Sequence, residues 1–453
     1  MKIIIAGCGK IGTTIVESLV AEGHDILIID NDDSIIQEIT NVFDVMGVCG
    51  NCVDSDVLEE ASVKTAELFL AVTDSDELNM LSCFLAKKMG AQHTIARIRT
   101  PEYNDKSLLV MKNNLEISMP INPERLAARE LFNILKFPSA VKLETFSHRN
   151  MEMAEVVLRE DSPLDGVKLS EIRGKFKANV LVCCVQRGEE IFIPDGSFAL
   201  RGGDRIGMTA SHTELQKLFR YTGLLKKQAR DVIILGGSRV SYYLAEMLAE
   251  IGASVKIIDR DEKVCELLGD KLPKAVVIRG DGTQQELLLR EGLSRTDAFV
   301  ALTGLDETNV LISMFATRRG VPKVIAKVNR EELIPMAEDL GLDCIVSPRK
   351  TVSDVVVSYA RAIENSLGSN VETLYKLMDD KVEALEFNVR EKSRVVDVPL
   401  KNLKLRKNIL IIGVIRDRKL ITPTGETEIQ LGDRVVVITA NQGLGDLSDI
   451  LER

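Results

Sequence analysis

A glycine-rich loop near the amino terminus is the first segment whose residue types could do specific chemistry. Its sequence is Gly7-Cys8-Gly9-Lys10-Ile11-Gly12, and it lies between a β-branched run at residues 3–6 and an amphipathic segment. Between a strand and a helix, such glycines allow a tight turn and let phosphate groups approach the unpaired N–H groups of the helix N-terminus. The spacing therefore predicts a site for a phosphorylated ligand.

Asp30 narrows the class of ligand. It ends the next apolar run, 18 residues after Gly12. A carboxylate at this place accepts hydrogen bonds from ribose hydroxyls, and its charge disfavours a 2′-phosphate. We therefore expect NAD or an adenosine phosphate rather than NADP. Lys10 lies inside the loop, where it is either a contact to a terminal phosphate or a solvated lysine at the start of the helix.

The second half of the chain carries an altered copy of this loop, Gly236-Gly237-Ser238-Arg239-Val240-Ser241, with Asp259 at the end of the next apolar run. Serine stands where the first loop has its second and third glycines. A serine Cβ would push phosphates outward, although a hydroxyl can also donate to them. Arg239 and Arg260 supply positive charge. Two interpretations stay open: a second site with altered preference, or a degenerate structural copy.

Both halves share a further landmark, AVTDSDELN at residues 71–79 and ALTGLDETN at residues 301–309. It follows an apolar run and therefore lies at a strand's carboxyl end, where open α/β sheets bind ligands. The residues expected to line the crevice are Thr73 and Asp74 in the first half and Thr303 and Gly304 in the second. Asp76 and Asp306 are expected to cap the helices that follow.

Four pairs of landmarks lie 229 residues apart, which indicates a duplication. The pairs that show it are Gly7 and Gly236, Asp30 and Asp259, Pro194 and Pro423, and Gly203 and Gly432. In each half, apolar runs alternating with helical patterns predict a doubly wound, Rossmann-like α/β domain with a parallel sheet, followed by a small α+β subdomain. The expected domains are residues 1–138, 139–222, 231–366 and 367–453, which leave no room for a separate catalytic domain.

The composition favours a soluble globular protein and excludes several classes. Of the 453 residues 28% are charged, and the net charge is -10. An acidic chain is a poor general binder of phosphate backbones, so we expect no nucleic-acid partner and a basic protein surface instead, such as the cytoplasmic loops of a membrane protein. No apolar run approaches the roughly 18 residues of a membrane helix. The start resembles no secretory signal, and we expect a cytoplasmic protein with reduced cysteines.

Two other sets of residues could do chemistry but are not expected to. Cys49 and Cys52 form a CxxC without a second pair at ligand spacing, so neither a metal site nor thiol chemistry is expected. A dehydrogenase needs an acid-base residue beside the nicotinamide, and no histidine is predicted there. The four histidines are His24, His93, His148 and His212. An NAD-dependent oxidoreductase nevertheless remains the alternative from a different class.

The order of these parts resembles RCK (KTN) modules. The resemblance is carried by the glycine loop, the strand-end acid, Gly50-Asn51 or Gly280-Asp281, the Thr-x-x-Asp-Glu-x-Asn segment, Ala96-Arg97, and Gly-Asp-Arg turns in the small domains. It covers essentially the whole chain. Two such modules in tandem, without a membrane pore, are similar to the cytosolic regulatory subunits of Trk-type potassium-uptake systems of bacteria.

The resemblance implies a non-enzymatic regulatory subunit that binds NAD(H) or ATP/ADP and gates a potassium-translocating, TrkH-like membrane subunit from its cytoplasmic face. It also implies a homo-oligomer, for which we expect a tetramer; another monovalent-cation channel or antiporter stays open as the partner. The first nucleotide site is assigned to Gly7, Cys8, Gly9, Lys10, Ile11, Gly12, Asp30, Asn51, Thr73, Asp74 and Arg97. The second is assigned to Gly236, Gly237, Ser238, Arg239, Val240, Asp259, Arg260, Asp281, Thr303 and Gly304, with Lys327 at the position of Arg97.

Overall fold

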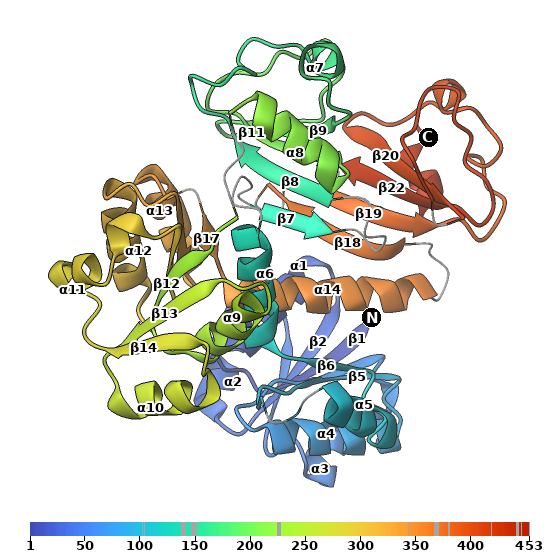
Figure 1. The fold of residues 1–453 in the computed structure, drawn as a ribbon. Coiled ribbons are helices and arrows are strands. Elements are labelled where there is room, and N and C mark those ends of the chain that lie inside the picture. The colour runs from blue at the N-terminus through green and yellow to red at the C-terminus, as the bar shows by residue number, and fades with distance from the viewer. Residues whose placement is uncertain are drawn as a thin grey trace.

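The chain folds into parallel and antiparallel β-sheets surrounded by helices (Figure 1). A computed structural model describes residues 1–452 except 102, 104, 137–141, 146–151, 224–227, 343, 367–370, 379–380, 418, 441–443 and 445. In this part of the chain, each half has a six-stranded parallel sheet followed by a five-stranded antiparallel sheet. The predicted fold class, two tandem Rossmann-like domains that are each followed by a small α+β domain, is confirmed.

The first parallel sheet has the strand order β3-β2-β1-β4-β5-β6, so the order reverses between β1 and β4. Ile3, Ile4 and Ile5 of β1 are fully buried because helices cover both faces of the sheet. The strands are β1 (Lys2–Ala6), β2 (Asp25–Asp30), β3 (Met46–Cys49), β4 (Leu68–Ala71), β5 (His93–Arg97) and β6 (Met119–Ile121). The helices are α1 (Lys10–Ala21), α2 (Asp33–Val42), α3 (Ser55–Glu60), η1 (Val63–Thr65), α4 (Asp76–Met89), α5 (Asp105–Asn114) and α6 (Pro123–Lys136).

The second parallel sheet repeats this plan in the order β14-β13-β12-β15-β16-β17. Its strands are β12 (Asp231–Leu235), β13 (Ser254–Asp259), β14 (Ala275–Arg279), β15 (Ala298–Ala301), β16 (Lys323–Lys327) and β17 (Ile345–Val346). Its helices are α9 (Arg239–Glu250), α10 (Glu262–Lys271), α11 (Gln285–Arg290), η2 (Leu293–Arg295), α12 (Asp306–Arg318), η3 (Glu331–Leu333), α13 (Ile334–Asp339) and α14 (Pro348–Ser366). The reversal between β12 and β15 creates an equivalent crevice.

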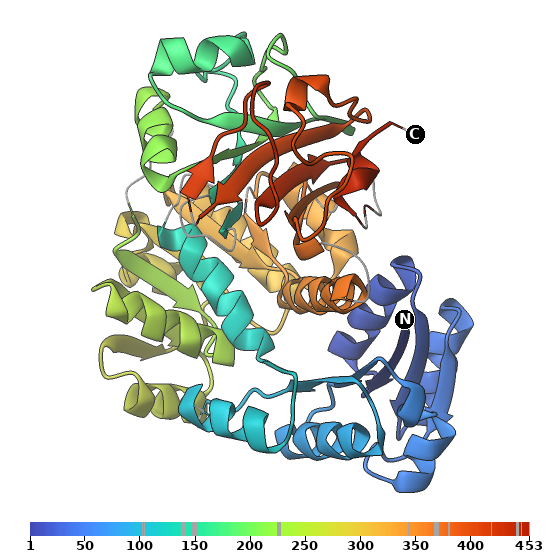
Figure 2. The same ribbon diagram turned by 90° about the vertical axis from the view of Figure 1, so that its right-hand side faces the viewer.

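The last helix of each α/β domain joins the core of the other domain. On α14, Val356 is buried in one cluster with Leu19 of α1, and on α6, Leu131 is buried with Leu244 of α9. Figure 2 shows α14 beside the N-terminal domain and α6 lying along the second domain. The two α/β domains are therefore joined by exchanged helices, and each apolar core is incomplete without the other half of the chain.

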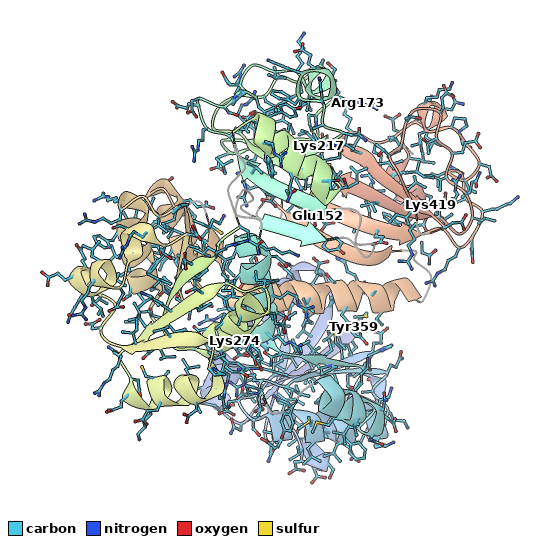
Figure 3. All side chains as sticks on the ribbon, viewed as in Figure 1. Glu152, Arg173, Lys217, Lys274, Tyr359 and Lys419 are labelled. Carbon is cyan, nitrogen blue, oxygen red and sulfur yellow. The ribbon has the colours of Figure 1, made fainter. Side chains whose placement is uncertain are left out.

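Polar contacts accompany this exchange on both sides. Tyr359 of α14 faces the first domain (Figure 3), where its hydroxyl lies 3.4 Å from His93 Nδ1 and the two rings are T-shaped. Tyr243 of α9 donates to the carbonyl oxygen of Arg99 at 3.1 Å. Because these hydroxyls are partly buried, their partners fix how the helices sit on the neighbouring domain.

The two small domains pack against each other through one cluster of buried apolar residues. Met153 and Cys184 of the first domain are buried in a cluster with Val382, Ala384 and Val436 of the second. The first sheet, in the order β10-β9-β11-β8-β7, contains β7 (Lys142–Thr145), β8 (Glu152–Val157), β9 (Leu181–Arg187), β10 (Glu190–Phe192) and β11 (Arg205–Ala210), with helices α7 (Leu169–Phe176) and α8 (His212–Tyr221). The second, in the order β18-β19-β22-β20-β21, contains β18 (Val371–Leu377), β19 (Val382–Asn388), β20 (Ile409–Arg416), β21 (Lys419–Ile421) and β22 (Arg434–Thr439), with η4 (Leu400–Asn402) and η5 (Leu447–Ile450).

A largely buried arginine links three parts of the molecule. Arg361 of α14 donates from Nε to Glu22 Oε2 at 2.6 Å and from Nη2 to Glu383 Oε1 at 2.9 Å. Glu22 caps the carboxyl end of α1, and Glu383 belongs to β19. The bridge thus connects the helix that follows the glycine loop, the exchanged helix and the second small domain. In the second half, Ile251 occupies the position of Glu22 at the end of α9, so no equivalent carboxylate is present there.

Replacing Arg361 by methionine is expected to destabilise the protein by roughly 3–5 kcal/mol, because the side chain of Glu383 is only 4% exposed and would be left as a buried charge without its cation. The midpoint of chemical denaturation measures this. Arg390→Met is the control, because Arg390 is exposed and lies in the small domain that contains Glu383; it should cost no more than about 0.5 kcal/mol. Equal losses in the two variants would contradict a structural role for the bridge.

Candidate functional site

A cavity of about 880 Å³ lies where the strand order of the first parallel sheet reverses. Both α/β domains line it, and the exchanged helices begin at its wall. The lining residues of the first domain include Gly7, Gly9, Lys10, Ile11, Asp30, Asn31, Asn51, Cys52, Thr73, Asp74, Arg97, Pro123 and Glu124. The second domain contributes Ser238, Arg239, Val240, Lys327, Asn329, Pro348 and Arg349. A ligand in this cavity would therefore touch both domains.

The first glycine loop needs its glycines for distinct steric reasons. Gly7 has a φ of +92°, and a Cβ there would lie 2.7 Å from the backbone nitrogen of Thr73. A Cβ at Gly12 would collide with the carbonyl oxygen of Gly7. Gly9 differs, because a Cβ there would meet open space and no side chain caps the first turn of α1 at this N-cap residue. The loop is thus packed tightly underneath and open toward the cavity, as a cradle for phosphate requires.

Asp30 holds the loop as well as facing the cavity. Its Oδ2 accepts a hydrogen bond from the backbone nitrogen of Cys8 at 2.7 Å, and its Oδ1 accepts one from Asp32 N at 3.1 Å. Asp259 does the same in the second half, with Gly237 N at 2.5 Å and Asp261 N at 2.8 Å. Each carboxylate oxygen has a further lone pair, so Asp30 can still accept from a ribose hydroxyl.

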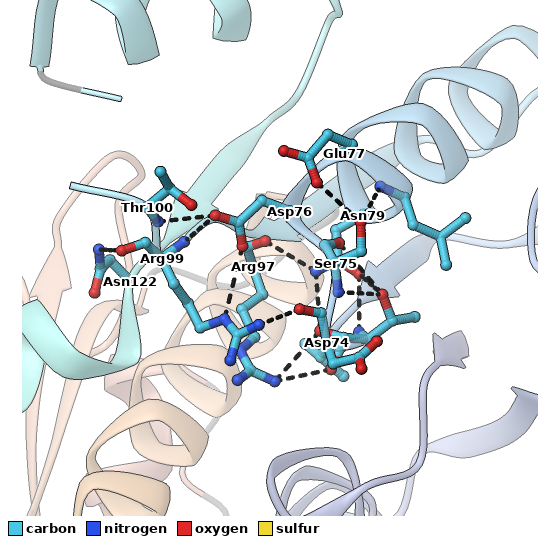
Figure 4. Close-up of polar contacts among 12 residues, drawn as sticks. Asp74, Ser75, Asp76, Glu77, Asn79, Arg97, Arg99, Thr100 and Asn122 are labelled. Atoms are coloured by element: carbon cyan, nitrogen blue, oxygen red, sulfur yellow. Dashed lines mark hydrogen bonds and ion pairs between the residues drawn. The ribbon is translucent and has the colours of Figure 1, made fainter. Parts of the chain in front are cut away.

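Asn79 fixes the edge of the crevice at the end of β4 (Figure 4). It is fully buried, accepts from Thr73 N at 2.8 Å and Thr73 Oγ1 at 2.7 Å, and donates to the carbonyl oxygen of Arg97 at 2.9 Å. Asn309 makes the same contacts with Thr303 and Lys327. These buried hydrogen bonds fix the segment that follows β4 in the first half and its counterpart after β15 in the second.

The prediction that Asp76 and Asp306 cap the following helices is wrong. Ser75 is the N-cap of α4 and accepts from Leu78 N at 3.1 Å. Asp76 instead accepts from the backbone nitrogens of Arg99 and Thr100, at 2.9 and 2.8 Å (Figure 4). Asp306 contacts the corresponding nitrogens at residues 329 and 330. Sequence spacing suggested a cap because a helix follows, but the buried carboxylates fasten the loop after the next strand.

Positive charge prevails in the cavity. Five cationic side chains line it against three acidic ones: the cations are Lys10, Arg97, Arg239, Lys327 and Arg349, and the acids are Asp30, Asp74 and Glu124. Burial lowers the pKa of Arg97 and of Lys327 from their ordinary values. The neighbouring Arg99 lowers the pKa of Arg97 further, whereas at Lys327 the charge of Asp306 opposes the lowering by burial and by Arg349. An anion bound among these groups would relieve that repulsion.

Two buried polar atoms of this wall lack a hydrogen-bond partner among the described residues, Arg97 Nε and Glu124 Oε2. Arg97 does donate from Nη1 to the carbonyl oxygen of Val72 at 3.2 Å. Free polar atoms at a wall, together with the open space at Gly9, fit a phosphorylated and hydroxyl-bearing ligand.

The structure divides the residues predicted for the second site. Ser238, Arg239, Val240 and Lys327 line the cavity of the first site, but the others assigned to the second site do not: Gly236, Gly237, Asp259, Arg260, Asp281, Thr303 and Gly304. Of the first-site residues, Cys8 and Gly12 do not line the cavity either. Sequence reasoning missed Asn31, Glu124, Asn329 and Arg349. A proline two residues after a strand, at Pro123 and Pro348, was the available signal that a helix begins at this edge.

The two cysteines of the CxxC differ in exposure and in their relation to the cavity. Cys52 is buried and lines the cavity, whereas Cys49 at the end of β3 is exposed. Burial, with the charge of Asp30 added, raises the pKa of Cys8 to about 12. In the part of the chain that the structure describes, no group of His, Cys, Asp and Glu could hold a metal ion.

Family models match most of the chain. The TrkA-N domain matches residues 3–114 and 232–348, and the TrkA-C domain matches residues 153–223 and 384–452. The chain belongs to the TrkA family. The alternation of the two domain types follows the duplication seen in the sequence, and the predicted resemblance is confirmed.

Relatives within the TrkA family match over nearly the full length. The chain is 33% identical over 437 residues to the Trk system potassium uptake protein TrkA homolog of Archaeoglobus fulgidus, covering 96% of this chain and 97% of the relative. It is 29% identical over 445 residues to TrkA of Vibrio alginolyticus, covering 98% and 96%. Among solved structures, the GsuK channel has a TM-score of 0.64 at 19% identity, and the GsuK channel bound to NAD has 0.63 at 18%; each comparison covers 97% of this chain and 76% of the channel. At this identity they show the shared fold.

Asn79→Ala is expected to cost at least about 2 kcal/mol of stability, because the buried Thr73 N–H and Arg97 carbonyl would lose their partner. Asn309→Ala should cost the same, since its contacts are identical. The midpoint of urea denaturation measures both. Asn114→Ala, at an exposed position of α5, should change it little. A cost at Asn79 no larger than at Asn114 would show that the wall does not depend on this side chain.

Proposed function

We propose that this TrkA-family protein binds an adenine nucleotide, NAD(H) or ATP/ADP, in the cavity and reports its phosphates to a potassium-translocating membrane partner. The single observation that carries the proposal is the shared cavity: one wall holds the glycine loop and Asp30, and the other holds cations from the second domain. The volume of about 880 Å³ falls within the range of small-molecule sites.

Each part of a nucleotide has a suitable partner here. Asp30 accepts from ribose hydroxyls, and the uncapped first turn of α1 takes a phosphate. Arg239 and Arg349 reach from the second domain toward further phosphates. Because a ligand between two domains interacts differently with each of their arrangements, it can shift the balance between arrangements, which is the physical requirement for regulation.

A regulatory role is favoured over catalysis. Among the described residues that line the cavity none is a histidine, the side chain that most often transfers protons in catalysis. The relatives in Archaeoglobus fulgidus and Vibrio alginolyticus carry the names of potassium uptake proteins. Steady oxidation of NADH by the purified protein with any small metabolite would instead support the NAD-dependent oxidoreductase.

The partner we propose is a TrkH-like potassium-translocating subunit, met at its cytoplasmic face. None of the described helices is long and apolar enough to cross a membrane. The net charge of -10 suits a surface rich in Lys and Arg, which cytoplasmic loops of membrane proteins provide. Co-purification with a monovalent-cation channel or antiporter, and not with a potassium-uptake subunit, would contradict the proposed partner and identify another.

A homotetramer is the assembly we propose, formed through apolar patches of the α/β domains. Leu311 of α12, Met336 of α13 and Leu340, the residue after α13, are 63, 60 and 52% exposed. Leu81 of α4 occupies the position of Leu311 and is 49% exposed. Neighbouring exposed apolar side chains mark contact surfaces. Sedimentation of the purified protein tests the assembly.

Asp30→Ala is expected to weaken binding of NAD and of ADP alike by about 10- to 100-fold, since hydrogen bonds to a charged group are worth roughly 1.5–3 kcal/mol. Isothermal titration calorimetry measures the affinity. Asp33→Ala, an exposed carboxylate on α2, is the matched control and should bind as the wild type does. Unchanged affinity of the Asp30 variant would remove the ribose assignment.

Arg239→Ala is expected to weaken ATP binding by about 10-fold or more while changing ADP binding less than about 3-fold, because the guanidinium faces the additional phosphate from across the cavity. Arg260→Ala, which removes an exposed arginine outside the cavity, should alter neither. Transport by the partner should lose its response to ATP in the Arg239 variant only. If the Arg239 variant still distinguishes ATP from ADP and transport still responds to ATP, Arg239 does not bind the γ-phosphate.

A further inference from the structure

The two glycine loops rest on the same backbone frame. Gly7 and Gly236 both have a left-handed φ, +92° and +101°, and a strand-end aspartate holds each loop through a backbone N–H. The loops differ at five of their six positions, and at two of these a glycine of the motif is replaced by serine: Gly9 by Ser238 and Gly12 by Ser241.

The deeper of these positions changes how the loop packs. Gly12 lies so close to the carbonyl oxygen of Gly7 that no Cβ fits between them. Ser241 stands there in the second half, is fully buried, and donates from its hydroxyl to the carbonyl oxygen of Gly236 at 2.5 Å. In the second loop the buried serine side chain therefore lies where the first loop has no side chain.

The outer position closes the start of the helix. Ser238 is the N-cap of α9, and its Oγ accepts from Ser241 N at 3.2 Å, while Ser241 Oγ lies 3.3 Å from Ser238 N. This is a reciprocal capping box. Two N–H groups that a bound phosphate would use are already satisfied within the loop. At α1 the corresponding N-cap, Gly9, has no side chain, and its first turn is uncapped.

The charges of the second domain also serve the other site. Arg239 follows Ser238 directly, yet it lines the cavity of the first site together with Lys327 and Arg349, whereas Asp259 does not line that cavity. On the inner side of the second loop, α10 packs so closely that a Cβ at Gly237 would collide with Val264. A phosphate on the second loop would have to displace the capping box.

We infer that each chain binds one nucleotide, in the first site, and that Ser238 and Ser241 are the residues that keep the second glycine loop from accepting phosphates. The inference rests on the proposed function, because it takes the first cavity to be a nucleotide site. On this inference the second domain binds no nucleotide of its own. It contributes the cations Arg239, Lys327 and Arg349 to the site of the first domain.

Calorimetric titration of the full-length protein with ADP and with NAD, up to about millimolar concentration, tests the inference through the number of ligands per chain. We expect one for each ligand, with an affinity that Asp30→Ala weakens by about 10- to 100-fold and that Asp259→Ala leaves unchanged. Two ligands per chain in the wild type, or loss of binding on Asp259→Ala, would overturn the inference while leaving the proposed function intact. No binding at all would end both.

A loop exchange tests the serines directly. Ser238→Gly with Ser241→Gly gives the second loop the glycine spacing of the first, and a second ligand per chain is expected, one whose affinity falls when Asp259→Ala is added. Ser238→Ala with Ser241→Ala is the control: it removes the hydroxyls but keeps the Cβ at 241, so one ligand per chain is expected. Circular dichroism confirms that each variant is folded. A folded glycine variant that still binds one ligand would overturn the role given to the serines.

Discussion

The exchange of α6 and α14 between the α/β domains is the constraint on which the rest of the structure depends. Each helix inserts apolar side chains such as Leu131 and Val356 into the other domain's core, and every fully buried side chain of this size contributes roughly 1.5–3 kcal/mol. Separating the domains would expose both cores. The same exchange brings Arg239 and Arg349 opposite the glycine loop, because α14 begins at the cavity wall. Which residues line the cavity therefore depends on how the exchanged helices complete the two cores.

Much of the fold and of the first site could be predicted from the sequence. β-branched runs such as Ile3 to Ile5 gave fully buried strands, and the glycine loop with Asp30 lies at the reversal of strand order as the motif requires. These predictions succeed because they depend on local chemistry: side-chain burial on both faces, and steric limits at Gly7 and Gly12.

What could not be predicted depends on contacts between distant parts of the chain. The apolar face of α6 shows that Leu131 is buried, but periodicity does not say against which domain. For the same reason Arg239 was assigned to its own loop, although it lines the other domain's cavity. Asp76 was misjudged because a carboxylate before a helix fits a cap equally well; its true partners, Arg99 N and Thr100 N, follow the next strand.

The distribution of thiols has a practical consequence for optical work. Seven of the eight cysteines are buried or half-buried, and burial raises the pKa of Cys8, Cys83, Cys183 and Cys265, so their reactive thiolate form is rare. Cys49 is exposed and sits close in sequence to Asn51 and Cys52 on the cavity rim. A maleimide dye should therefore label the unaltered protein at one place, near enough to the cavity for its fluorescence to follow ligand arrival without any engineered cysteine.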